Sequence, residues 1–270
     1  MRLKYRLGWI PDVPDQRDIP FMQVFRVPRK LPPSVVLRVG CSPVEAQGNL
    51  GSCTAQALVG ALEFLELRAL GNQSARFRDL SRLFVYYNER LAIGTVLEDS
   101  GAMLRTGIKV LKSRGVCREA LWPYDIRLFS VEPLKPCYTE AACHQVTAYQ
   151  RLSTLAEMKA CLAMGLPFVF GFAVYEHVMS AAVERTGKIR MPRPGEAMVG
   201  GHAVMAVGYR DRTRSLLFRN SWGSDWGQAG YGELPYAYLA ERNLTDDFWC
   251  IQGTESDLYA AWRLSPERIC

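Results

Sequence analysis

The stretch Gln47–Leu58 reads Q-G-N-L-G-S-C-T-A-Q-A-L, a glycine-broken loop that leads into a helical pattern. Leu58, Ala61 and Leu65 recur at the spacing of one helix face, so Cys53 is expected at or near the helix N-terminus. Unpaired backbone N–H groups and the helix dipole at such a terminus favour a thiolate over a thiol. The sequence therefore predicts a nucleophilic cysteine at position 53.

Two later stretches supply the groups that such a nucleophile requires. G-G-H-A-V-M-A-V-G-Y from Gly200 places His202 at the start of an apolar run that is typical of a buried strand. S-L-L-F-R-N-S-W-G-S-D-W-G from Ser215 is expected to be the next strand, after a turn at residues 211–214, and Asn220 follows it. Adjacent antiparallel strands would bring His202 and Asn220 side by side, so that the amide orients the imidazole.

The remaining pattern separates into a helical half and a strand-rich half. Helices are expected over residues 80–91, 103–115 and 154–165, the last opened by a capping box of Thr154 and Glu157. Strand-like runs cover residues 166–174, 202–209, 215–219 and 247–251. This order predicts two lobes with a cleft between them, with Cys53 from the first lobe and His202 and Asn220 from the second.

Three motifs in this order resemble the papain-type cysteine peptidases. They are Gln47 with G-S-C-T, then H-A-V-x-A-V-G-Y, then N-S-W-G-x-x-W-G-x-x-G-Y. L-P-P-S-V-V-L-R from Leu31 and W-P-Y at Trp122 match further landmarks of the family, so the resemblance extends from about Leu31 to Ile251. Among its members, the chain is most similar to bacterial ones with a short propeptide, because the long helical propeptide motif is absent.

The resemblance implies an α+β, two-lobed papain-like fold, with a helical left lobe and a β-barrel-like right lobe around an active-site cleft. It also implies three segments. Residues 1–30 are propeptide-like, residues 31–252 form the peptidase domain, and residues 253–270 form a C-terminal tail. Within the peptidase domain, the helical lobe covers about 40–140 and the strand-rich lobe about 145–252.

The resemblance also assigns catalytic roles. Cys53 attacks the peptide carbonyl, His202 takes and returns the proton, and Asn220 orients the imidazole. The side-chain amide of Gln47, with the backbone N–H of Cys53, donates to the developing oxyanion. This chemistry requires no metal and no organic cofactor.

Substrate-binding residues follow from the same comparison. Gly101 would offer its backbone to an extended peptide. Ala102, Met103, Gly171 and Gly201 would form the walls of the pocket for the residue two before the scissile bond, with Asp246 at its floor. Trp222 would shield the hydrogen bond between His202 and Asn220. Gly51 and Ser52, directly before the nucleophile, complete the expected set.

The cysteines depart from the plant and animal members of the family. Leu50 stands where those members have a cysteine, and D-S-G-A at residues 99–102 replaces its partner motif, so their best-known disulfide is impossible here. The eight cysteines include no C-x-x-C motif. Buried thiols are the favoured interpretation, and a loop bridge between Cys137 and Cys143 is the alternative in an oxidising compartment.

Composition excludes several other classes of protein. The 270 residues are 49% hydrophobic and 22% charged, as in ordinary globular proteins. The net charge of +6 comes without a run of Lys and Arg, so a nucleic-acid partner is not expected. No apolar run has the length of a signal peptide or a membrane span, and the compartment stays open. We expect a monomer that acts on peptides or proteins.

Residues 1–30 are expected to be an intramolecular inhibitor that makes the enzyme a zymogen. Four prolines favour an extended segment. The expected anchors are the apolar residues Trp9, Ile10, Ile19, Phe21 and Phe25, while Asp12, Asp15 and Asp18 pair with a basic surface. Propeptides of the family cross the cleft opposite to a substrate, but nothing in this sequence fixes the direction.

Two alternatives to a cysteine endopeptidase remain. An exopeptidase would use the same chemistry with one end of the cleft blocked. A peptide-binding or inhibitory module would keep the fold without the reaction. An acyltransferase of the transglutaminase type is more remote, since such enzymes usually orient the histidine with an aspartate.

Overall fold

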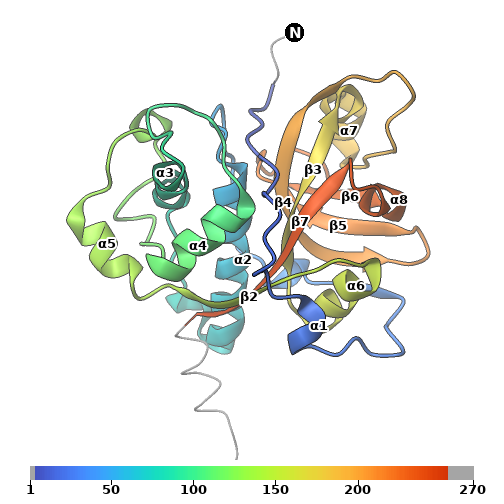
Figure 1. The fold of residues 1–270 in the computed structure, drawn as a ribbon, viewed down its shortest axis with the longest axis horizontal. Coiled ribbons are helices and arrows are strands. Elements are labelled where there is room, and N and C mark those ends of the chain that lie inside the picture. The colour runs from blue at the N-terminus through green and yellow to red at the C-terminus, as the bar shows by residue number, and fades with distance from the viewer. Residues whose placement is uncertain (1–3, 255–270) are drawn as a thin grey trace, which may run out of the picture.

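The computed structural model describes residues 4–254, and its elements form a helical part and a sheet (Figure 1). The helices are α1 (Phe21–Val24), α2 (Cys53–Leu70), α3 (Arg82–Ala92), α4 (Leu104–Ser113), α5 (Lys135–Ala141), α6 (Leu155–Ala163), α7 (Ala181–Thr186) and α8 (Tyr236–Ala240). The strands are β1 (Ser34–Val36), β2 (Val146–Arg151), β3 (Phe168–Tyr175), β4 (Met198–Arg210), β5 (Ser215–Arg219), β6 (Tyr231–Pro235) and β7 (Thr245–Thr254). Residues 253–270, expected as a tail, lie mostly outside this range.

Local signals in the sequence fix the helix ends. Helix α3 begins after Ser81, whose hydroxyl accepts from the backbone N–H of Phe84 at 3.1 Å. The capping box of α6 is present: the Thr154 hydroxyl accepts from the Glu157 N–H at 3.2 Å, and the Glu157 carboxylate accepts from the Ser153 N–H at 2.8 Å. The expected helices over 80–91, 103–115 and 154–165 are therefore confirmed as α3, α4 and α6.

The sheet is antiparallel, in the order β2-β7-β3-β4-β5-β6, and β1 pairs with β4. Strands β4 and β5 form the expected hairpin, with Arg210 opposite Ser215 at its closed end. The sheet does not close into a barrel, because β2 and β6 remain its two ends within residues 4–254. The β-barrel-like lobe of the sequence prediction is thus an open sheet.

Two hydrophobic clusters form the core, and the first joins the two halves. One joins α2, α3 and α4 to the face of the sheet that meets α2, and the other lies between the sheet, α6 and α8. Helix α2 is buried over most of its length, from Cys53 to Glu66. Because its first residue points at β4, the packing of this helix against the sheet sets the position of Cys53.

The amino-terminal segment runs between the two halves. Figure 1 shows it as the dark-blue trace that passes between helices α2 and α4 and strands β3, β4 and β7. Phe21 in α1 is fully buried and stacks on Phe25 with ring centroids 4.7 Å apart. Within residues 4–254, no helix is both long and apolar enough to cross a membrane.

Candidate active site

Cys53 is the first residue of α2, as the sequence predicts, and its side chain is fully buried. Its thiol lies next to the backbone of Ala203 and Gly8. Ala203 follows His202 on β4, so the helix start and the strand meet at the thiol. Gly8 belongs to the amino-terminal segment, which therefore lies directly over the candidate nucleophile.

His202 and Asn220 lie side by side at the end of the β4–β5 hairpin. His202 Nε2 donates to Asn220 Oδ1 at 2.8 Å, and the same oxygen accepts from the Ser221 N–H at 2.9 Å. His202 Nδ1 has no partner within the described chain. The hydrogen bond fixes the tautomer and leaves Nδ1 as the ring atom free to exchange a proton.

Aromatic rings enclose the imidazole. Trp222 stacks on His202 with ring centroids 4.6 Å apart, and Phe172 meets the imidazole edge-on with centroids 5.7 Å apart. Both rings are almost fully buried. They exclude water from the hydrogen bond between His202 and Asn220, which strengthens its electrostatic part.

Gln47 lies in the same site with its side chain fully buried. Its Oε1 accepts from the Ser221 hydroxyl at 2.7 Å, which orients the amide. Its Nε2 donates to the carbonyl of Leu50 at 2.8 Å and to the carbonyl of Arg6 at 3.0 Å. The carbonyl of Arg6, in the segment that covers Cys53, thus already accepts a hydrogen bond from the side-chain amide of Gln47.

Three residues that the sequence did not single out hold the loop before Cys53. Asp99 accepts from the Gly51 N–H at 2.9 Å and from the Tyr86 hydroxyl at 2.5 Å. The Tyr124 hydroxyl lies 2.5 Å from that of Ser52. These hydrogen bonds therefore hold Gly51 and Ser52 in place. The only sequence signal for them was the D-S-G-A stretch, which contains Asp99.

The segment pairs with both walls of the cleft through its backbone. The Trp9 N–H donates to Gly201 at 3.1 Å, the Ile10 N–H donates to Ala102 at 2.9 Å, and the Gly8 carbonyl accepts from Ala102 at 2.9 Å. Trp9 and Ala102 form a parallel bridge. A peptide of extended shape therefore fits between Ala102 and Gly201.

The Trp9 indole fills a pocket between two glycines. A Cβ atom on Gly171 would lie 1.9 Å from the indole ring, and one on Gly201 would lie 2.8 Å from it. The absence of side chains at these positions creates the space for a large side chain. Of the expected pocket walls, Gly171, Gly201 and Ala102 surround Trp9, while half-buried Met103 follows as the N-cap of α4.

Asp247, and not the expected Asp246, lies at the floor of the pocket that holds Trp9. Asp247 is fully buried and its Oδ2 accepts from the Trp9 indole at 3.0 Å, whereas the Asp246 side chain is 48% exposed and pairs with Arg151 at 2.8 Å. The register between β3 and β7 shifts between Val169 and Gly171, and Asp247 has a φ of 58°. This bulge turns Asp247 inward.

Gly101 does not pair with the amino-terminal segment, because its backbone groups have other partners. Its N–H donates to the Tyr86 hydroxyl at 3.1 Å, and its carbonyl accepts from the Ser100 hydroxyl at 3.0 Å. Ala102 supplies both backbone groups to the segment instead. Gly101 contributes space: it has a φ of 76°, and a Cβ there would lie 2.1 Å from the Gly8 carbonyl oxygen.

The segment continues past Cys53 to Trp222. The Tyr5 ring stacks on Trp222 with centroids 4.4 Å apart and an interplanar angle of 1°. The segment therefore places Tyr5 on Trp222, Gly8 over Cys53 and Trp9 in the pocket. Each step is fixed by a named contact.

Burial changes the pKa values of Cys53 and His202 in this covered site. It raises the pKa of Cys53 to about 12 and lowers the pKa of His202 to about 4. At neutral pH the covered site therefore holds a thiol and a neutral imidazole. The thiolate expected from the helix N-terminus is not the favoured form while the segment excludes water.

A further acidic pair lies beneath the segment. Burial, together with the charge of Asp12, raises the pKa of Asp247 to about 7, and burial raises the pKa of Asp12. Asp12 accepts from the Trp249 indole at 2.9 Å, and its N–H donates to Asp247 at 2.8 Å. Two carboxyl groups thus anchor the segment where it leaves the pocket.

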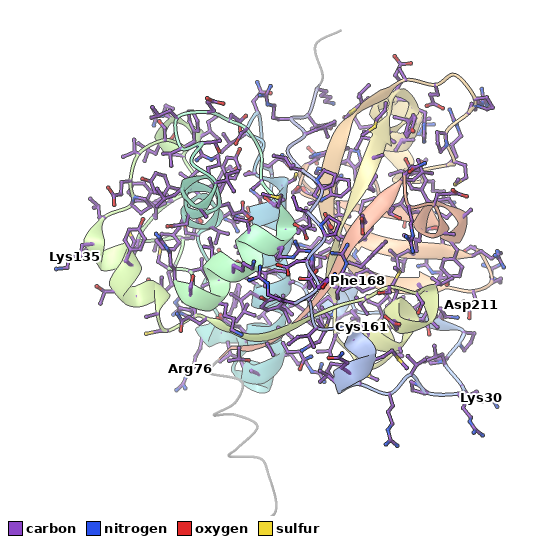
Figure 2. The ribbon with its side chains drawn as sticks, in the orientation of Figure 1. Lys30, Arg76, Lys135, Cys161, Phe168 and Asp211 are labelled. Carbon is purple, nitrogen blue, oxygen red and sulfur yellow. The ribbon has the colours of Figure 1, made fainter. Side chains whose placement is uncertain are left out.

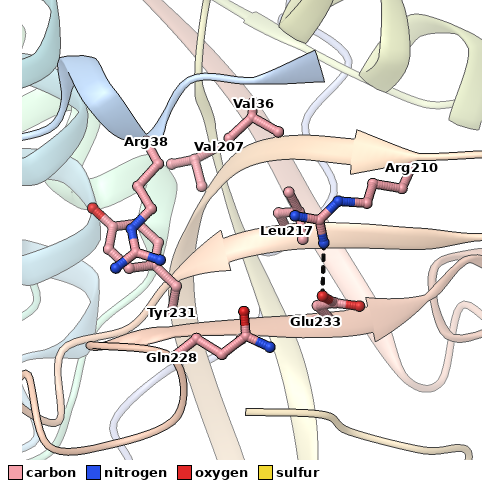
Figure 3. Close-up of a pocket in the computed structure, with 9 residues that line it drawn as sticks. Val36, Arg38, Val207, Arg210, Leu217, Gln228, Tyr231 and Glu233 are labelled. Atoms are coloured by element: carbon pink, nitrogen blue, oxygen red, sulfur yellow. Dashed lines mark hydrogen bonds and ion pairs between the residues drawn. The ribbon is translucent and has the colours of Figure 1, made fainter. Parts of the chain in front are cut away.

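Another pocket lies on the sheet, away from these residues. Figure 3 shows it between β1, β4, β5 and β6, where Arg210 and Glu233 form an ion pair of 2.8 Å. Its volume of about 40 Å³ is close to that of one or two water molecules. It is too small for a peptide. In residues 4–254, no group of three or more His, Cys, Asp or Glu is arranged to hold a metal ion.

Comparison with known sequences places the chain in a family. The profile of the papain family cysteine proteases matches residues 31–238. A peptidase C1-like protein of Acanthamoeba polyphaga mimivirus is 38% identical, over 91% of this chain and 86% of that protein. Chymopapain from Carica papaya is 25% identical over 72% of this chain, which spans about half (51%) of chymopapain's length.

Solved structures agree. Xylellain, a cysteine protease from Xylella fastidiosa, is 40% identical with a TM-score of 0.82, over 93% of this chain and 97% of that one. Procathepsin L2 from the larval midgut of Tenebrio molitor is 20% identical with a TM-score of 0.72, which supports the fold alone. The chain belongs to the papain family of cysteine proteases and is a papain-type thiol hydrolase.

Proposed function

We propose that the protein is a cysteine endopeptidase in which Cys53 is the nucleophile, His202 the general base and acid, and Asn220 the residue that orients the imidazole. The observation that carries this assignment is the meeting of Cys53 with β4 at Ala203, next to a histidine whose Nε2 is held by Asn220 and whose Nδ1 is free. A base fixed by a third group beside a thiol is the arrangement that nucleophilic catalysis needs.

Gln47 donates to the oxyanion in this proposal. Its amide is oriented by Ser221 and already donates to a peptide carbonyl, that of Arg6. Donors fixed before the reaction stabilise developing charge without reorganising, and one such donor contributes about 3–4 kcal/mol to lowering the barrier.

The amino-terminal segment keeps the enzyme latent. In the family, the pocket that holds Trp9 takes the residue two before the scissile bond, so a substrate would continue toward higher residue numbers past Cys53. The segment does the reverse, because its residue numbers fall from Trp9 in the pocket to Tyr5 on Trp222. A reversed chain covers the thiol while no scissile carbonyl is aligned for attack.

The path of the segment favours an endopeptidase over an exopeptidase. A continuous chain passes Cys53 and extends beyond it on both sides, from Lys4 near Glu184 to Asp12 near Trp249. A cleft that accepts chain on both sides accommodates an internal peptide bond. Faster cleavage of peptides with both ends blocked than of peptides with free ends is the result expected, and the reverse preference supports the exopeptidase.

An electrophilic peptide inhibitor tests the catalytic assignment. We expect one equivalent to attach to Cys53, located by mass spectrometry, in a chain that begins at Pro11. His202→Ala should abolish this reaction, while the matched His144→Ala should not, because His144 pairs with Glu66 at 2.7 Å, outside the site. Binding of a peptide without covalent attachment would instead favour the peptide-binding module.

A further inference from the structure

Two pairs of buried cysteines lie outside the candidate active site. Cys117 lies beside Cys137 in one hydrophobic cluster, and Cys161 lies beside Cys250 in the other. All four side chains are at most 1% exposed. Neither pair was predicted from the sequence, in which the members of each pair are far apart.

The first pair belongs to the helical half. Cys117 precedes Arg118, which bridges to Leu80, and Cys137 lies in α5 with its thiol directed toward the Leu121 carbonyl at 3.8 Å. The alternative bridge from Cys137 to Cys143 is not what this arrangement favours. Cys143 is exposed, whereas Cys137 faces the core beside Cys117.

The second pair joins α6 to β7. Cys161 lies in the last turns of α6, where its thiol donates to the Leu166 carbonyl at 3.4 Å and its own carbonyl accepts from the Leu166 N–H at 3.1 Å. Phe168, which starts β3, lies opposite Cys250 on β7. Figure 2 shows Cys161 close to Phe168, at the place where α6 meets the sheet.

The other described cysteines have different surroundings. Cys41 is partly buried with its thiol toward the Leu37 carbonyl at 3.8 Å, beside Tyr231. Cys53 is the candidate nucleophile and Cys143 is exposed. Only two pairs within residues 4–254 place one thiol against another, and they fall one in each half of the fold.

We propose that Cys117–Cys137 and Cys161–Cys250 are disulfide sites, one in each lobe, that close when the chain folds under oxidising conditions. The oxidant is a small disulfide such as oxidised glutathione. One protein thiolate attacks it and releases one reduced glutathione. The partner thiolate then displaces the second glutathione, so that one Sγ–Sγ bond forms, two cysteines are oxidised and one glutathione disulfide is reduced.

Burial decides when the bonds form. It raises the pKa of Cys117 and of Cys161, so in the folded chain these thiols are neither accessible nor ionised. Exchange therefore takes place while the chain folds. The Cys161–Cys250 bond closes the longer loop, which contains His202 and Asn220, and closing a longer loop restricts the unfolded chain more.

The test is disulfide mapping of the full chain with Cys53→Ser, which cannot cleave itself. The chain is refolded in buffers of increasing oxidised glutathione, free thiols are alkylated, and the protein is digested without reductant. Trypsin with a Glu-specific protease separates Cys137 from Cys143, because Glu140 lies between them. We expect two linked peptides, Cys117 with Cys137 and Cys161 with Cys250, and a mass about 4 Da lower.

Single variants assign each bond. Cys117→Ser should lose only the first bond and Cys161→Ser only the second. Each should lower the urea midpoint more in oxidised than in reduced buffer, because only the oxidised chain loses a bond, whereas Cys41→Ser should change the midpoint equally in both buffers. Exposed Cys143 reports that the oxidant is active, by its glutathionylation. Four reduced core cysteines in a sample with glutathionylated Cys143, or dominant links to Cys41 or Cys143, would overturn the proposal.

Discussion

The indole N–H of Trp9 donates a 3.0 Å hydrogen bond to Oδ2 of Asp247, so a residue of the amino-terminal segment meets a fully buried carboxylate at the floor of the pocket. A substrate side chain that replaces Trp9 would meet the same carboxylate. A cationic side chain would gain a charge-assisted contact there.

Asp247→Ala is therefore expected to lower kcat/KM for substrates with Arg two residues before the cut by about 10- to 100-fold relative to substrates with Leu. Asp246→Ala is the matched control, because its exposed carboxylate pairs with Arg151 outside the pocket. The measurement is kcat/KM for both substrates at equal titrated Cys53, in a chain that begins at Pro11. An equal loss for both substrates would remove Asp247 from specificity.

The carboxyl group of Asp247 also makes the closure of the amino-terminal segment over the site depend on pH. Its pKa is about 7 in the covered site, and exposure to water returns it toward the ordinary value of 3.8. A group with the higher pKa in the closed state binds protons more tightly there. Closure is therefore strongest below the ordinary pKa and weakens as the pH rises toward 7.

We expect the activity of the full chain, divided by that of the chain from Pro11, to rise at least about tenfold between about pH 4 and about pH 8. Asp12, Asp246 and Arg151 face Asp247 and shift the midpoint without reversing the sign. Asp247→Asn should flatten the profile. A ratio that rises on acidification would contradict this reading of the carboxyl pair.

Glu89 offers a separate test of burial. It is fully buried, accepts from the hydroxyl of Thr54 in α2 at 2.8 Å, and its pKa is raised to about 8 by burial. In the unfolded chain, Glu89 ionises near its ordinary pKa of 4.5. The free energy of unfolding therefore falls as the pH rises from 4.5 to about 8.

Glu89→Gln removes this loss because glutamine does not titrate. The free energy of unfolding of the variant, relative to the wild type, should increase by about 4 kcal/mol between about pH 4.5 and about pH 8. Urea unfolding at both pH values measures it, with exposed Glu98→Gln as the control. A difference that does not change with pH would show that Glu89 is ionised in the folded chain.

The sequence predicted the elements that local patterns encode. The helix start at Cys53, the capping box at Thr154 and the hairpin that joins His202 to Asn220 all follow from periodicity and turn signals, and the structure has them. Strands β2 and β6 and helix α5 were not predicted, because they are short and stabilised by their neighbours rather than by their own pattern.

Contacts between distant segments were harder to predict. Asp246 was chosen by counting along the chain, and the bulge at Asp247 shifts the count by one. Of the apolar residues expected to anchor the segment, Trp9 fills its pocket and Phe21 is fully buried. Ile10 and Ile19, by contrast, are 36% and 46% exposed. Asp18 pairs with Arg105 and Arg151 as expected, Asp15 pairs with Arg17 of its own segment, and Asp12 is buried against Trp249.

Residues 5–10 cover Cys53, and the burial that results favours its neutral thiol. Removing residues 1–10 leaves Asp12, Asp18 and Phe21 to keep the rest of the segment in place. The uncovered thiol regains water, the helix N-terminus and a His202 that is free to become cationic, all of which lower its pKa.

The direct measurement is the rate at which iodoacetamide labels Cys53 at about pH 6, resolved from the other cysteines by mass spectrometry, in the full chain and in the chain from Pro11. We predict that the shorter chain is labelled at least about 100-fold faster, and that His202→Ala removes this gain. Equal rates in the two folded chains would show that the segment neither covers Cys53 nor controls its ionisation.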